Sequence, residues 1–66
     1  MNLKDFTVPE LDRFRELCNF TEDELRYFNL RSLNYTNVQI AFIMYISESQ
    51  VSKLARKVKN KIMRVV

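Results

Sequence analysis

The chain has 66 residues, 47% of them apolar and 29% charged, with a formal net charge of +3. This length can enclose one small core, which excludes a two-domain enzyme. Because the chain has no glycine, no histidine and a single cysteine, it also lacks phosphate-binding glycine loops, a zinc ligand set and an internal disulfide, so we expect no enzymatic activity, metal or cofactor.

Four segments begin with a hydroxyl residue that is followed three positions later by Glu or Gln, the pattern of a helix capping box. An apolar residue stands before each hydroxyl and another after each Glu or Gln, as in a hydrophobic staple. The four pairs are Thr7 with Glu10, Thr21 with Glu24, Thr36 with Gln39 and Ser47 with Gln50. They predict helices at about residues 8–18, 22–33, 37–44 and 48–63, and no segment has the pattern of a strand.

The first two predicted helices have signals at both ends. Pro9 falls in a first turn, where its missing N–H costs little, and Asn19 and Asn34 stand where a left-handed residue ends a helix in the absence of glycine. The acidic run at residues 22–24 complements the positive end of the second helix and needs no catalytic role. We expect Cys18 to be a small buried apolar side chain.

The third predicted helix is apolar on nearly every side, and such a helix is normally buried on more than one side. Two explanations are open for its Phe42 and Ile43: the first helix folds over them within the monomer, or they meet another chain. We favour cover by the first helix, because that helix must bury an apolar stripe of its own. Its stripe comprises Leu11, Phe14, Leu17 and Cys18.

The fourth predicted helix has an apolar stripe and a cationic face. At ~100° per residue, the stripe consists of Val51, Leu54, Ala55, Val58 and Ile62, and the opposite face carries Ser49, Ser52, Lys53, Arg56, Lys57, Asn60 and Arg64. Residues 31–66 hold seven bases and one acid, whereas residues 1–30 hold seven acids and four bases. A basic helix can be a solvated surface, a membrane-surface helix or a nucleic-acid footprint.

We favour a nucleic-acid footprint for this face. A merely solvated helix would intersperse acids with the bases, and a membrane-surface helix would carry Trp or Phe on its apolar side. An α-helix also fits the major groove of DNA. No apolar run approaches the ~18 residues that span a bilayer, and no signal-type stretch follows residues 1–5. With a lone cysteine, this favours a cytoplasmic protein with no membrane partner.

Residues 20–62 carry caps, a small residue and apolar anchors at characteristic spacings. They are Phe20-Thr21-x-x-Glu24-Leu25, Phe28 and Leu30, Thr36-Asn37-x-x-Ile40-Ala41, and Ile46-Ser47-x-x-x-Val51 with Leu54, Val58 and Ile62. This stretch resembles the DNA-binding domain of LuxR-type response regulators and, more distantly, region 4 of bacterial sigma factors. The resemblance implies one small all-α domain of four helices over residues 1–66. The second to fourth helices would form a tri-helical helix-turn-helix core, preceded by an extra N-terminal helix. In this pattern Ala41 lets two helices approach, Ile46 fills the turn and Val51 anchors the second helix of the motif.

The resemblance also implies roles for individual residues. The fourth helix would be the recognition helix in the major groove, and the third would support it across the phosphate backbone. The base-facing residues are then Ser49, Gln50, Ser52, Lys53 and Arg56, and the phosphate contacts are Thr36, Asn37, Lys57, Lys59 and Lys61. Thr36 and Ser47 are equally well explained as helix caps alone.

The sequence departs from the LuxR pattern at several positions. That family prefers glycine where Asn34 stands and polar residues where Phe42 and Ile43 stand. It also has a further helix used in dimerisation, which has no counterpart here, so its mode of dimerisation is not carried over. A monomer that reads one short site would bind weakly, so we expect a homodimer or tethering to a larger complex such as RNA polymerase. The candidate interface residues are Phe42, Ile43, Met63 and Val65.

The predicted function is a sequence-specific regulator of transcription that binds double-stranded DNA. The alternative is a protein-interaction module on the same scaffold, either a sigma-like fragment or a small regulator that docks on polymerase. Polar substitutions at Phe42 and Ile43 separate the two hypotheses, because only in the alternative would activity be lost while DNA affinity persists.

Overall fold

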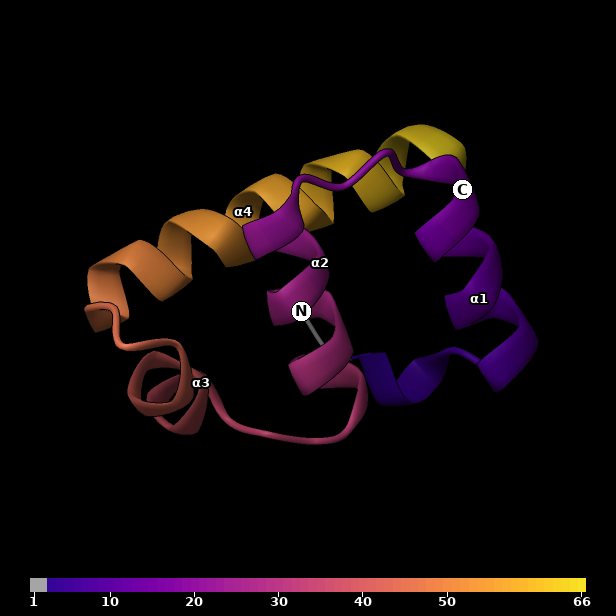
Figure 1. Cartoon of the computed structure of the whole chain (residues 1–66). Coiled ribbons are helices and arrows are strands. Elements are labelled where there is room, and N and C mark those ends of the chain that lie inside the picture. Colours follow the sequence, from indigo (N-terminus) through magenta and orange to yellow (C-terminus); the bar gives the residue numbers. More distant parts are fainter. Residues whose placement is uncertain (1–2) are drawn as a thin grey trace.

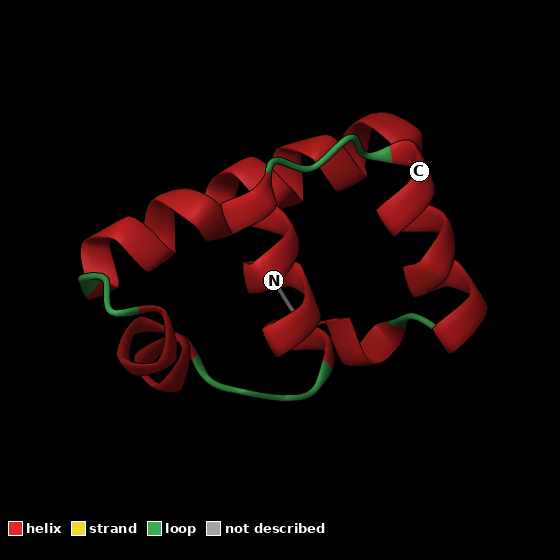
Figure 2. Ribbon diagram, viewed as in Figure 1, coloured by secondary structure: helices red, strands yellow, loops and turns green. Residues whose placement is uncertain are grey.

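The computed structural model describes residues 3–66, apart from the side chain of Lys4, and this part of the chain is all-α. Its helices are α1 (Val8–Leu17), α2 (Glu22–Ser32), α3 (Asn37–Met44) and α4 (Glu48–Val65), preceded by the 3-10 helix η1 (Leu3–Asp5). Figure 2 shows helices and loops but no strand within these residues. The predicted fold class is confirmed, and each α-helix begins at its predicted residue and ends within two residues of its predicted end.

All four predicted capping boxes are present in the described residues, which explains why the helix starts could be predicted so closely. At the start of α3, for example, the amide of Gln39 donates to Thr36 Oγ1 at 3.2 Å, and the amide of Thr36 donates to Gln39 Oε1 at 2.9 Å. Each box satisfies backbone donors that a helix leaves unpaired at its first turn.

The ends of α2 and α3 share a Schellman motif. Asn34, with φ of 73°, ends α2 as predicted, and the amide of the next residue, Tyr35, donates to the carbonyl of Leu30 at 3.2 Å. At the end of α3 the left-handed residue is Tyr45, with φ of 57°, and the amide of Ile46 donates to the carbonyl of Ala41 at 3.1 Å. Asn19 is left-handed as predicted, whereas the left-handed Tyr45 was not foreseen.

The core lies where α4 packs on α2 and α3. Phe28, Ile40, Val51 and Val58 are the largest side chains that are fully buried, and they come from all three of these helices. Ala41 is buried where α3 meets the core, Cys18 is buried as expected, and Ile62 extends the buried stripe of α4. The predicted apolar face of α4 therefore faces inward.

The expectation that the first helix covers Phe42 and Ile43 is wrong. In Figure 1, α3 lies near the start of α4, whereas α1 lies near its end, beside the C-terminus. Phe42 is 84% exposed and Ile43 is also exposed. No helix within residues 3–66 is long and apolar enough to span a membrane.

Contacts with α2 hold α1 in its observed place. Arg15 Nε donates to Asn29 Oδ1 at 2.8 Å, and the guanidinium of Arg15 lies 5.2 Å from the centre of the Phe28 ring. Phe14 packs edge-on against Phe6, with ring centres 4.9 Å apart. Of the apolar stripe predicted for α1, Leu11, Phe14 and Cys18 are buried on the side of the core away from α3, whereas Leu17 is 52% exposed.

Candidate nucleic-acid interface

The exposed side of α4 carries the residues that were predicted to face DNA. Its 18 residues extend about 27 Å at 1.5 Å per residue. Val51, Val58 and Ile62 are buried on one side of the helix. The exposed side includes Ser49, Gln50, Ser52, Lys53, Arg56, Lys57, Lys59 and Asn60. A rigid helix held by its apolar stripe therefore displays a polar and cationic face to solvent.

Four basic side chains of this face stay out of the two ion pairs that the structure gives for the described side chains. These pairs are Arg15 with Asp12 and Lys61 with Glu24. Lys53, Arg56, Lys57 and Lys59 take part in neither. Their charges therefore remain available to an anionic partner.

One acid, Asp23, lies beside the cationic face. It comes from the first turn of α2 and lines a hollow of about 240 Å³ together with Gln50, Lys53 and Lys57 of α4. From its place in the sequence, Asp23 is expected only to complement the positive end of the α2 helix dipole. The helix-turn-helix pattern implies that the second helix packs on the fourth. That packing could have predicted the position of Asp23 beside the fourth helix.

Gln50 has a structural task besides any contact with DNA. Its Oε1 accepts a hydrogen bond from the amide of Ser47 at 3.2 Å, and its own amide donates to Ser47 Oγ at 3.2 Å. The capping box therefore fixes the start of α4 and uses the side-chain oxygen of Gln50. Thr36 has the same capping role at the start of α3, so its hydroxyl also serves the fold.

Asn37 is held at the start of α3 by a buried tyrosine of α2. Tyr27 is 2% exposed, and its hydroxyl donates to Asn37 Oδ1 at 3.0 Å. A tyrosine hydroxyl is protonated at neutral pH, and burial raises the pKa of Tyr27 further, so the hydroxyl remains a donor. The bond fixes the direction of the Asn37 side chain, which was predicted to contact phosphate.

Lys61 lies in a different environment from the other predicted phosphate contacts. Its ammonium group pairs with the carboxylate of Glu24, which is 4% exposed, and donates to the carbonyl of Asn19 at 3.1 Å. Burial by itself would raise the pKa of Glu24, but hydrogen bonds from Lys61 and Thr21, together with the charge of Lys61, hold it below its ordinary value. Because Lys61 already joins α4 to α2, we leave it out of the proposed interface.

The candidate partner-interface residues fall on two separate surfaces. Phe42 and Ile43 are exposed on α3, and Met63 and Val65 are exposed near the end of α4. Figure 1 shows these two regions at opposite ends of the molecule. A single flat contact would therefore not use both.

The chain matches no protein-family model, no curated protein and no solved structure. Ala41 is buried where α3 meets the core, Ile46 is half-buried in the turn, and Val51 is fully buried.

Proposed function

We propose that this chain is a sequence-specific regulator of transcription that binds double-stranded DNA with a LuxR-like helix-turn-helix. The observation that carries the proposal is the exposed cationic face of α4, whose basic residues Lys53, Arg56, Lys57 and Lys59 take part in neither the Arg15–Asp12 nor the Lys61–Glu24 ion pair. A buried apolar stripe fixes this face in orientation, which a recognition helix requires. The proposal includes a cytoplasmic location, in keeping with a single reduced cysteine.

In the proposed complex, α4 enters the major groove with its exposed face toward the base edges. Lys53 and Arg56 lie on that face and carry the donors that guanine O6 and N7 accept. A bidentate bond from Arg56 to guanine would supply about 1–3 kcal/mol of discrimination against other bases. Lys57 and Lys59 would bind phosphates, adding affinity without reading sequence.

The start of α3 supports this arrangement. The hydrogen bond from Tyr27 engages Asn37 Oδ1 and leaves the amide nitrogen of Asn37, a hydrogen-bond donor, directed away from that contact. The first backbone amides of a helix carry a partial positive charge, so phosphate is favoured at this end of α3. The supporting helix would thus fix the register of α4 in the groove.

The proposal is tested by selecting double-stranded DNA from a random pool and measuring the affinity of the enriched sequence. We expect one enriched motif, and Arg56→Ala should weaken binding to it about 5- to 150-fold, the equivalent of about 1–3 kcal/mol, and relax the preference at one base pair. Lys53→Ala should also weaken binding.

Arg13→Ala is the matched control, because Arg13 is an exposed base on α1, outside the proposed interface. It should leave the affinity unchanged. A pool with no enriched motif, or equal affinities for wild type and both α4 variants at low salt, contradicts the proposal.

A second candidate function is a module that docks on RNA polymerase or another protein through α3. The exposed Phe42 favours it, since a ring left 84% exposed is suited to a protein contact. Binding to purified RNA polymerase tests this second function. The polymerase should bind the wild-type chain but not Phe42→Ser, and the selection from the random DNA pool should enrich no motif.

A further inference from the structure

The outward side of α3 is an apolar surface without cover in the described chain. Ile40 and Ala41 are buried on the inner side of the helix. On the outer side Phe42 is 84% exposed and Val38 is 61% exposed, and Tyr45 in the following turn is 95% exposed. No residue of α3 is charged. We call Tyr35, Val38, Phe42, Ile43 and Tyr45 the α3 patch.

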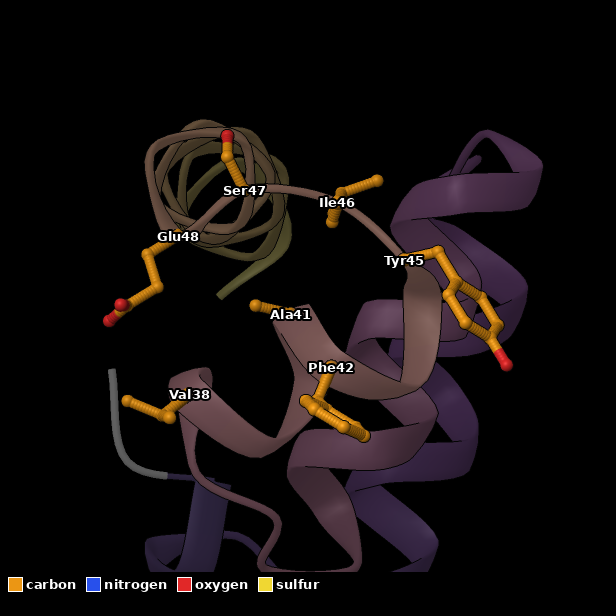
Figure 3. Close-up of a pocket in the computed structure, with 7 residues that line it drawn as sticks. All are labelled: Val38, Ala41, Phe42, Tyr45, Ile46, Ser47 and Glu48. Carbon is orange, nitrogen blue, oxygen red and sulfur yellow. The ribbon is translucent and has the colours of Figure 1, made fainter.

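Phe42 stands as a ridge between two hollows. The first, of about 510 Å³, lies between α3 and the start of α4 and includes Val38 and Tyr45 in its lining (Figure 3). The second, of about 330 Å³, lies on the other side of the ring and includes Tyr35 and Ile43 in its lining. Figure 3 shows Ala41 directed inward, whereas Phe42 and Tyr45 project outward. The patch therefore combines a protruding aromatic ring with mainly apolar hollows of a size to receive one, the first of which also has Ser47 and Glu48 in its lining.

Tyr45 adds an exposed aromatic ring to the patch at a position where the backbone favours glycine. It has φ of 57° and ψ of 42°, a left-handed conformation that the turn into α4 requires and that is unfavourable for a bulky residue. Its ring gains almost no burial in return, because it is 95% exposed. The ring is therefore accessible to a second molecule.

We propose that the α3 patch is a homodimer interface, in which the Phe42 ring of each copy enters a hollow beside Phe42 of the other. A two-fold contact needs a surface that complements itself, and a ridge flanked by hollows meets this requirement. Aromatic side chains bury about 150–250 Å² each, so Phe42 and Tyr45 with the less exposed Tyr35, Val38 and Ile43 supply roughly 600 Å² per partner, the area of a weak dimer at the lower end of specific interfaces.

Charge does not prevent a second copy from docking on this surface. Each chain carries a net charge of +3, so two copies repel each other wherever their basic faces meet. No residue of α3 is charged, and the charged residue that lines the first hollow, Glu48, is an acid and not a base (Figure 3). The inference does not depend on DNA binding and is tested without DNA.

Sedimentation equilibrium of the full chain measures the mass at protein concentrations from about 1 μM to 1 mM. This range detects a dimer whose dissociation constant is micromolar to millimolar. The expected result is a rise from 8.0 kDa toward twice that mass with increasing concentration. Phe42→Ser should stay at the monomer mass over the range. Val8→Ser, which removes another exposed apolar side chain, on α1 and outside every candidate interface, should dimerise like the wild type. Circular dichroism should show equal helix content in all three chains.

The same dimer is mapped without any substitution by recording amide chemical shifts of the wild type during dilution. Shift changes centred on residues 35–45 support the proposal. Three results overturn it: a wild type that stays at 8.0 kDa throughout, a Phe42→Ser chain that dimerises as well as the wild type, or shift changes centred on the end of α4. A monomeric wild type would leave the α3 patch to a different protein.

Discussion

Among single residues, Glu24 and Lys61 form an ion pair that joins α2 to α4. The pair thereby connects the acidic N-terminal part of the chain to the basic C-terminal part. Glu24 belongs both to the capping box of α2 and to this pair, which connects residues 37 positions apart. Because the Glu24 side chain is buried, its charge is stable only while Lys61 and Thr21 donate to it. The pair therefore contributes specificity to the way that α2 and α4 meet.

Glu24→Gln should lower the free energy of unfolding by about 1–3 kcal/mol at neutral pH, since the amide keeps the cap but leaves the partly buried Lys61 without a counter-charge. Because the pKa of Glu24 is lowered on folding, its contribution is complete above its ordinary value of 4.5 and is lost as pH falls through the lowered pKa. The stability difference between wild type and variant should therefore shrink from pH 7 to pH 3.

Thermal unfolding of both chains across this pH range provides the measurement. Glu22→Gln is the control, because Glu22 is an exposed acid in the same first turn. It should lower the free energy of unfolding only by the weak interaction of a carboxylate with the helix dipole. A pH-independent difference between wild type and Glu24→Gln would show that the charge pair contributes nothing to stability.

At the scale of elements, the turn between α3 and α4 fixes the angle of the helix-turn-helix. The amide of Ile46 bonds to the carbonyl of Ala41, and the side chain of Ile46 is half-buried against the core, so the turn is held from both the backbone and the side chain. This geometry requires a left-handed residue at position 45, where the chain has tyrosine instead of glycine. The turn is thus maintained at the expense of backbone strain.

Tyr45→Gly should stabilise the monomer by up to about 1 kcal/mol, because relief of about 1–2 kcal/mol of left-handed strain outweighs the extra freedom of glycine in the unfolded chain. For a domain of this size the melting temperature should rise by roughly 4–8 °C per kcal/mol. Dilute samples keep the dimer from contributing to the measured transition.

Tyr45→Ala is the matched variant, since it removes the same ring but keeps the unfavourable backbone. It should show no such gain in melting temperature. Equal melting temperatures for the glycine and alanine variants would mean that the left-handed backbone is not strained by a side chain.

At the scale of the whole molecule, the fold converts a charge asymmetry along the sequence into one in space. Most acids lie in η1, α1 and α2, and α4 carries six of the eleven bases. The packing of α2 on α4 brings these halves into contact at Glu24 with Lys61 and at the hollow shared by Asp23, Lys53 and Lys57. The exposed Asp23 then opposes the approach of a phosphate to this part of α4.

Under the proposed function, Asp23→Asn should bind DNA about two- to fivefold more tightly at low salt, because it removes a charge that repels phosphate. The gain should decrease as salt screens the interaction. Fluorescence anisotropy with a labelled duplex measures both effects. Glu16→Gln removes an exposed acid from α1 instead and should change the affinity little, so equal gains for the two variants would point to net charge and not to position.

Local sequence is enough to predict the helix starts, the polarity of α4 and the left-handed asparagines that end α1 and α2. Capping boxes, apolar periodicity and left-handed asparagines depend on residues within a few positions of one another, so a short stretch of chain contains all that produces them. Local sequence does not predict that α1 packs away from α3, that Phe42 stays exposed, that Lys61 pairs with Glu24 or that Tyr45 takes a left-handed backbone. These features depend on contacts between distant segments. An apolar stripe in a sequence indicates that one face of a helix is buried. It does not indicate which segment covers that face, because the hydrophobic effect is non-directional.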